Sequence, residues 1–392
     1  MTDTGLVQNK SVQSGKKLDH AQSLIAGVAG VEEVQSFLSA FPDYQTTPLV
    51  ELKDLARSLG LTTIMIKDES GRYGLSSFKA LGGAYAVARV VHRYVEEKLG
   101  RKVTPSELTS DECKAVAAQL TICCATDGNH GRSVASGAEK YGCRCVIFLH
   151  ENVTQGREDA IARFGAEIIR TKGNYDDSVA QSFKMAEENG WTVISDFSRA
   201  GYTEIPGLVM QGYTLMLNEI WEQSSQDYSH IFIQAGVGGL AAVVAGFYLE
   251  KMGDKRPKLV VVEPERANCL QRSAQVGRAI AMEPGEETIM AMLECYEPSL
   301  SAWEVLEKAA DYFLTVREDM AVTALKQLAH PLGSDPTLKI GESGASGLAG
   351  LLTATANPTF VKELGLNEAS RVLLVGTEGA TDEALYQKLL AS

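Results

Sequence analysis

The stretch AVAAQLTICCATDGNHGRSVASGAEKYGCRCVIFLH, residues 115–150, decides the fold class expected for this chain. Its first part, 115–126, is a run of small and apolar residues that predicts a buried strand. Residues 128–142 predict a helix closed by Gly142, and residues 143–150 predict a second strand. A strand, a helix and a strand at this spacing indicate a parallel sheet with right-handed crossovers.

The same alternation continues along the chain and predicts an α/β fold. The predicted helices are 154–165, 176–190, 203–222 and 239–252, and the further strands are 166–171, 191–197, 230–236, 258–265 and 371–379. Residues 300–355 read as mostly helical, with a loop at 330–336. At 392 residues the chain is long enough for two domains.

Composition and charge exclude several classes of protein. A hydrophobic content of 45% is typical of an ordinary globular protein. The net charge of −13 argues against a surface for nucleic acid or for anionic membranes. No stretch is apolar enough for a membrane span, and the polar first residues do not form a signal peptide, so we expect a cytoplasmic protein.

The seven cysteines predict neither disulfides nor a metal site. Their number is odd, Cys123 and Cys124 lie in a predicted strand, and Cys143 and Cys145 begin the next one. Cysteines in such runs usually behave as small buried apolar residues, and the chain has no paired CxxC motifs. We therefore expect no bound metal.

Ligands of open parallel sheets bind beyond the carboxyl ends of the strands, and three turns there carry unusual residues. In ATDGNHGRS (125–133), glycines allow main-chain amides to approach a ligand, although a capped helix start is the alternative. In QAGVGGLAAVVAG (234–246), amides at a helix start could bind an anion such as phosphate, and a tight packing turn is the alternative. In VGTEGATDE (375–383), Thr377 comes directly after the apolar run RVLLVG (371–376) of a predicted strand, although an ordinary loop is the alternative.

A fourth stretch, LSSFKALGGAY (75–85), contains a single lysine, Lys79, among small and apolar residues. A lysine that is removed from water can lose its proton and become a nucleophile. The alternative is a solvated lysine at a helix start, which is the usual place for this residue.

Five stretches in order resemble one enzyme family. They are YQTTPL (44–49), IKDESGRYGLSSFKALG (66–82), TDGNHG (126–131), GVGGL (236–240) and ESGASG (342–347). Together they resemble the pyridoxal-phosphate enzymes of fold type II, the tryptophan-synthase β type. The resemblance implies two open twisted, mostly parallel sheets flanked by helices. It further implies a large cofactor-binding domain (1–88 and 216–392) and an inserted small domain (89–215) that closes over the active-site cleft.

The resemblance also implies a pyridoxal 5'-phosphate cofactor, a homodimer and roles for particular residues. Lys79 would form the Schiff base with the cofactor aldehyde, Asn129 would contact the ring hydroxyl and Thr377 the pyridine nitrogen. The cofactor-binding residues would be Phe78, Lys79, Asn129, Gly236, Val237, Gly238, Gly239, Leu240 and Thr377, with the turn amides on the phosphate. The substrate-binding residues would be Thr126, Asp127, Gly128, His130 and Tyr202.

Within this family, the chain departs from the common pattern at Asp127, where many members have serine. This aspartate, together with residues 195–216 and 288–306, resembles the diaminopropionate ammonia-lyases. Those enzymes cleave 2,3-diaminopropionate, a small amino acid, to pyruvate and two ammonia molecules. The alternatives are a serine or threonine dehydratase, a serine racemase, or a non-catalytic protein that binds the cofactor.

Two aspartates suit a substrate whose leaving group is an amine. Asp127 and Asp196 could hold an ammonium group, and Asp196 follows the apolar part, WTVIS (191–195), of a predicted strand, although a loop cap would explain it too. We expect Asp127 to act on the face of the substrate opposite Lys79. Two bases on opposite faces would accept both the D and the L substrate. Lys79, Asp127 and Asp196 are thus the predicted catalytic residues, and Tyr202 is expected to gate the cleft.

Overall fold

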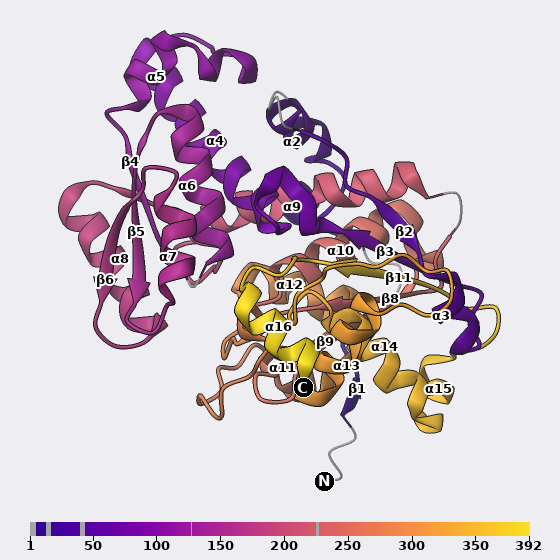
Figure 1. Ribbon diagram of the computed structural model, residues 1–392. Helices are drawn as coiled ribbons and strands as arrows, with labels where there is room; N and C mark the ends of the chain where they lie inside the picture. The colour runs from indigo at the N-terminus through magenta and orange to yellow at the C-terminus, as the bar shows by residue number, and fades with distance from the viewer. Residues whose placement is uncertain (1–4, 13–16, 40–43, 127, 225–226) are drawn as a thin grey trace.

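The computed structural model describes residues 5–12, 17–39, 44–126, 128–224 and 227–392 (Figure 1). It contains a seven-stranded sheet with the order β1-β10-β9-β8-β11-β3-β2. The strands are β1 (Leu6–Gln8), β2 (Leu49–Glu51), β3 (Thr63–Asp68), β8 (His230–Gln234), β9 (Lys258–Pro264), β10 (Tyr312–Val316) and β11 (Arg371–Gly376). The five inner strands are parallel, and only the edge strands β1 and β2 pair antiparallel with their neighbours.

A second sheet has four parallel strands in the order β6-β5-β4-β7. Its strands are β4 (Thr121–Ala125), β5 (Arg144–His150), β6 (Glu167–Thr171) and β7 (Thr192–Val193). It lies apart from the large sheet, at the left of Figure 1. The prediction of an α/β fold with two mostly parallel sheets is therefore confirmed.

Helices cover both sheets. Those of the first half are α1 (His20–Ala26), α2 (Val31–Leu38), α3 (Lys53–Ser58), η1 (Glu69–Gly74), α4 (Lys79–Leu99), η2 (Pro105–Thr109), α5 (Asp111–Ala117), α6 (Asn129–Tyr141), α7 (Gln155–Ala162) and α8 (Tyr175–Asn189). Those of the second half are α9 (Glu204–Gln223), α10 (Gly239–Met252), η3 (Gly253–Lys255), α11 (Cys269–Val276), η4 (Ala291–Leu293), α12 (Leu300–Ala309), α13 (Glu318–Ala329), α14 (Ser346–Ala356), α15 (Pro358–Leu364) and α16 (Glu383–Ala391).

One apolar core runs from sheet to sheet. It joins Val91 of α4 and Met216 of α9 to Ile147 of the small sheet and Ile231 of the large sheet. A second core fills the opposite face of the large sheet, under α13 and α14. Helices α4 and α9 thus connect the two sheets, and the expected domain boundaries at 88/89 and 215/216 fall inside them, so that division stays a prediction.

Three predicted elements differ from the structure. Residues 115–117 end helix α5, and the strand begins only at Thr121, because short runs of alanine suit a helix as well as a strand. The strand expected at 191–197 is confined to Thr192–Val193. Residues 300–355 contain a strand that was not predicted, β10, whose sequence YFLTV is rich in aromatic and β-branched residues.

Two other expectations concern membranes and metals. Within the described residues, no helix is long and apolar enough to cross a bilayer. The same residues contain no cluster of histidine, cysteine or carboxylate side chains that could hold a metal ion. Cys123, Cys124, Cys143 and Cys145 are buried free thiols, as the sequence predicts.

Candidate active site

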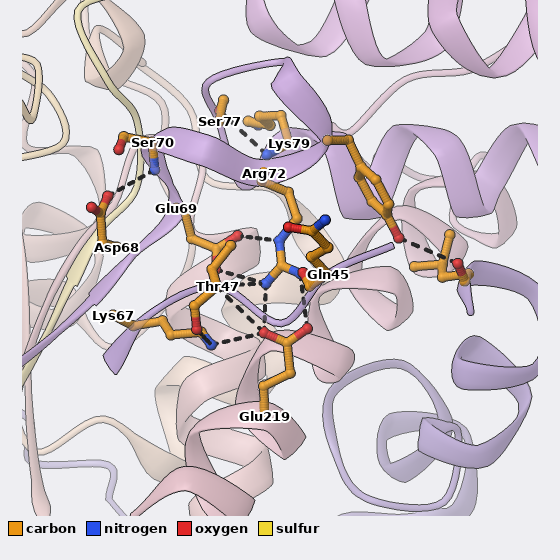
Figure 2. A network of polar contacts seen from close by, with 12 residues as sticks. Gln45, Thr47, Lys67, Asp68, Glu69, Ser70, Arg72, Ser77, Lys79 and Glu219 are labelled. Carbon is orange, nitrogen blue, oxygen red and sulfur yellow. Dashed lines mark hydrogen bonds and ion pairs between the residues drawn. The ribbon is translucent and has the colours of Figure 1, made fainter. Parts of the chain in front are cut away.

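Lys79 begins helix α4, directly after the segment that leaves strand β3 (Figure 2). The Phe78 amide donates to the Thr377 carbonyl oxygen at 2.9 Å, so this segment is held at the carboxyl end of β11. The Phe78 ring packs on Tyr213, with 4.7 Å between ring centroids. Lys79 therefore lies where open parallel sheets bind their ligands.

The Lys79 ammonium pairs with the Asp196 carboxylate, which comes from the loop after β7 in the other half of the molecule. The two side chains are 23% and 17% exposed, so the pair is only partly buried. Burial lowers the pKa of Lys79, but Asp196 outweighs burial and holds this pKa above its usual value. The neighbours of Lys79 in the sequence are small or apolar, so its partner Asp196 comes from a distant part of the chain and keeps the amine protonated instead of favouring loss of its proton.

Other titratable groups surround this pair. Burial raises the pKa of Asp196, but the Lys79 charge and then His130 outweigh it and leave the pKa below its usual range. His130 is buried, and its Nε2 donates to the Ile194 carbonyl oxygen at 2.8 Å. Burial lowers the pKa of His130, so this ring is neutral with Nδ1 as an acceptor. Tyr213 and Cys295 also lie close enough to Lys79 to affect its pKa.

The turn GVGGL connects β8 to α10, and at two of its glycines, Gly236 and Gly238, there is little space for a side chain. Gly238 has a φ of +100°, and a Cβ there would lie 3.0 Å from Leu306 Cδ1. A Cβ at Gly236 would lie 2.8 Å from Cys295 Sγ. The first amides of α10 have no partner within the helix, and its N-terminus favours an anion. The turn therefore fits a phosphate group held by main-chain N–H groups.

Thr377 lies beyond β11, and its hydroxyl is oriented by a residue that the sequence analysis missed. The two hydrogens of Gln234 Nε2 are shared among three acceptors, which are Thr377 Oγ1 at 2.9 Å and the carbonyl oxygens of Gly344 and Val375. Because Thr377 Oγ1 accepts this bond, its own hydrogen is free to be donated to a ring nitrogen. The position of Gln234 at the end of a buried strand was the signal that could have identified it.

A second missed residue, Glu378, lies in the same turn. Its carboxyl group contacts the Asn129 amide, whose Oδ1 accepts from Arg132 at 2.6 Å. Burial, followed by the nearby Glu342 carboxylate, raises the pKa of Glu378 to about 8, against the bond to Asn129. Residues that follow strands of the two sheets thus meet here. The signal that could have identified Glu378 was an acidic residue directly after a buried strand.

The remaining predicted residues support loops around the site. Thr126 is buried, and its hydroxyl accepts from the amides of Gly128 and Gly131 at 3.1 and 3.0 Å. The Tyr202 hydroxyl donates to the Val193 carbonyl oxygen at 2.8 Å, so the predicted gate is bonded to the end of β7. Asp127 lies outside the described residues.

A network of buried charges lies next to the Lys79 segment, below it in Figure 2. Arg72 donates to both oxygens of Glu69 and both oxygens of Glu219, at 2.7 to 2.8 Å. Lys67 donates to Glu219, to the Thr47 carbonyl oxygen and to Gln223. The charged members are at most 2% exposed, and their charges balance.

The network holds a strained stretch of backbone. Tyr73 and Ser76 have φ values of +48° and +55°, which non-glycine residues rarely adopt. Such conformations persist when the surroundings determine them, and Arg72 directly precedes Tyr73. The buried network thus fixes the path from β3 to Lys79.

The sequence comparisons agree with this geometry. Residues 40–378 match the model of the family described as "Pyridoxal-phosphate dependent enzyme". The chain belongs to this family. It is 37% identical over 363 residues to the diaminopropionate ammonia-lyase of Escherichia coli K12, covering 91% of this chain and 90% of that protein. A biosynthetic L-threonine dehydratase of Pasteurella multocida is 29% identical over 65% of this chain.

A solved structure of the family has the same fold as this chain. The crystal structure of the E. coli diaminopropionate ammonia-lyase in complex with an aminoacrylate-PLP azomethine reaction intermediate is 35% identical, with a TM-score of 0.87. The similarity covers 98% of this chain and 96% of that chain. The cofactor of this family is pyridoxal phosphate, and the glycine turn, Thr377 and Lys79 fit its phosphate, ring nitrogen and aldehyde.

Proposed function

We propose that the chain catalyses the α,β-elimination of 2,3-diaminopropionate, in both its D and L forms. Water is consumed, and pyruvate and two ammonia molecules are released. The similarity to the E. coli enzyme over nine tenths of both chains supports this substrate. We therefore do not propose the alternative of a non-catalytic protein that binds the cofactor.

The observation that carries the proposal is the contact between Lys79 and Asp196. A carboxylate that already holds one ammonium can hold a second at the β-position of the substrate. In serine and threonine the group that leaves from the β-carbon is a neutral hydroxyl. Elimination from these substrates therefore does not need this anion. The pair therefore favours an amine leaving group over the dehydratase and racemase alternatives.

Bound pyridoxal phosphate supplies the electron sink for the α-carbon. The chain's own residues supply binding and proton transfer. The first amides of α10 hold the phosphate, and the Thr377 hydroxyl, oriented by Gln234, donates to the ring nitrogen. Because a hydroxyl carries no charge, the ring nitrogen accepts a hydrogen bond without being protonated.

Lys79 and Asp127 divide the proton transfers in this proposal. Once the substrate amine replaces it at the cofactor, Lys79 becomes free to remove the α-proton of the L form. Asp127 takes the α-proton of the D form from the other face. Asp196 balances the ammonium that leaves, and the released enamine hydrolyses in water to pyruvate and the second ammonia.

A panel of substrates tests the proposal. We expect kcat/KM for D- and L-diaminopropionate to exceed that for L-serine and L-threonine at least about 100-fold, roughly 2.7 kcal/mol in the barrier. Two ammonia molecules should appear for each pyruvate. Turnover of L-serine or L-threonine at an equal or higher kcat/KM would instead identify a dehydratase.

We further propose that the protein is a cytoplasmic homodimer. The family resemblance supports this assembly, and the net charge of −13 suits a protein that stays dissolved. Light scattering after size-exclusion chromatography tests the assembly. A mass near twice 42.2 kDa is expected, and a single-chain mass would contradict it.

A further inference from the structure

The two segments that resemble the diaminopropionate ammonia-lyases, 195–216 and 288–306, meet in a buried contact between two serines. The Ser198 amide donates to Ser299 Oγ at 3.0 Å, and the two hydroxyl oxygens are 2.8 Å apart. Ser198 is 1% exposed and Ser299 is fully buried. We call this pair of side chains the serine clasp.

Ser198 of the clasp also caps the N-terminus of helix α12, although it belongs to a distant part of the chain. The Leu300 amide donates to the Ser198 carbonyl oxygen at 3.0 Å, and the Ser301 amide donates to Ser198 Oγ at 2.8 Å. Ser299 precedes α12, but its own side chain makes no bond to the first turn. Ser198 therefore satisfies two helix amides that the helix itself leaves unpaired.

The clasp connects two parts of the active site. On one side, Asp196 is two residues from Ser198 in the same loop. On the other side, the Ser299 amide donates to the Val237 carbonyl oxygen, in the glycine turn, at 2.9 Å. A short chain of buried bonds thus links the carboxylate that holds Lys79 to the turn that fits the phosphate.

We propose that Ser198 and Ser299 are positioning residues that fix Asp196 relative to Lys79 and to the phosphate-binding turn. In this way they set the preference for a substrate with an amine leaving group. The inference rests on the proposed function. Its physical basis is that a displacement of about 1 Å at a reacting group can reduce the rate about 100-fold.

A merely structural clasp would behave differently. Loss of a buried hydrogen bond lowers stability by itself, whatever the bond positions. A structural role would therefore lower the melting temperature and affect all substrates alike. A positioning role changes the substrate preference and the environment of the Lys79 nitrogen.

The test uses the holoenzyme variants Ser198→Ala, Ser299→Ala and the double variant. Ser182→Ala is the matched control, because Ser182 is also 1% exposed and its hydroxyl donates to Val179 within its own helix. Three quantities are measured for each: cofactor Kd, kcat and KM for L-diaminopropionate and L-serine, and absorption of the bound cofactor as a function of pH.

We expect both single variants to lose at least about tenfold in kcat/KM for diaminopropionate, mainly in kcat, with a smaller loss for serine. Cofactor Kd should change less than about threefold. Because a nearby carboxylate stabilises a proton on the Lys79 nitrogen, the absorption titration should move to lower pH. The double variant should lose no more than Ser198→Ala, since both serines act through one contact.

The inference is overturned if the two substrates lose activity equally or if the titration matches that of Ser182→Ala. If Ser198→Ala does not fold, Ser299→Ala decides, because it leaves both caps of α12 in place. If the wild-type enzyme does not turn over diaminopropionate, the proposed function fails. The absorption titration then still tests whether the clasp positions Asp196.

Discussion

Two lysine–carboxylate contacts in the described part of the chain differ in burial and in the pKa of the lysine. Lys67 is fully buried and donates to three acceptors, Glu219, the Thr47 carbonyl oxygen and Gln223. Burial lowers its pKa, against the attraction of Glu219 and Glu69. Lys79 is 23% exposed, pairs with Asp196, and has a raised pKa because this anion outweighs burial.

The difference shows that a shifted pKa does not by itself identify the reactive lysine. By that criterion Lys67 would be chosen, since its proton is the easier one to lose. Its three acceptors occupy all three of its hydrogens, however, and no ligand can reach it. Lys79 is partly exposed, and it pairs with one anion for which a substrate amine can compete.

The largest effect should come from Lys79→Ala. We expect kcat to fall about 10⁴-fold, roughly 5.5 kcal/mol in the barrier, because a covalent group and a base are lost together. Visible absorption of the bound cofactor should change as well. The matched variant Lys67→Met should retain more than half of the activity per folded molecule. Equal losses in both variants would contradict the distinction between a reactive Lys79 and a structural Lys67.

Arg72→Met should affect stability more than any change at Lys79. It leaves Glu69 and Glu219 buried without their main partner, which costs about 3–5 kcal/mol. Urea unfolding followed by fluorescence measures this loss, with Arg101→Met as the control because Arg101 pairs with glutamates on the surface. A loss below about 1 kcal/mol at Arg72 would show that the network is not a structural anchor.

Asp127→Asn tests the second base of the proposed mechanism. This change keeps the size of the side chain and removes its basicity, so turnover of D-diaminopropionate should fall at least about 100-fold, roughly 2.7 kcal/mol. The L form should lose less, because Lys79 serves it. Steady-state kinetics on each enantiomer separates the two, and small equal losses would make Asp127 a helix cap.

A smaller effect is expected at the glycine turn. Gly238→Val places a branched side chain at a positive φ and against Leu306, so the cofactor Kd should rise about 30-fold, roughly 2 kcal/mol. Gly60→Val is the control, since Gly60 also has a positive φ but has open space around it. Equilibrium dialysis gives both values, and a change within twofold at Gly238 would mean that the phosphate lies elsewhere.

Local patterns predict much of this fold and part of its site. Helix α10 begins and ends where the sequence predicts, because its apolar run follows a glycine turn. Strand β10 and the end of α5 were missed, since short apolar runs suit either structure until packing decides.

In the site, residues identified by a motif were easier to predict than residues identified by their partners. Lys79 and the glycine turn are recognisable from neighbouring residues. Gln234, Glu378 and the serine clasp depend on contacts between segments up to 249 residues apart, which no local pattern contains. The pairing of Lys79 with Asp196 was missed for the same reason.

The most direct test is to map the lysine that carries the cofactor. The holoenzyme is treated with borohydride, which makes the bond between cofactor and lysine permanent, and its peptides are then analysed by mass spectrometry. We expect the cofactor mass on the peptide that contains Lys79 and none on the peptide that contains Lys67. Label on Lys67 or on any other lysine, with Lys79 unmodified, would contradict it.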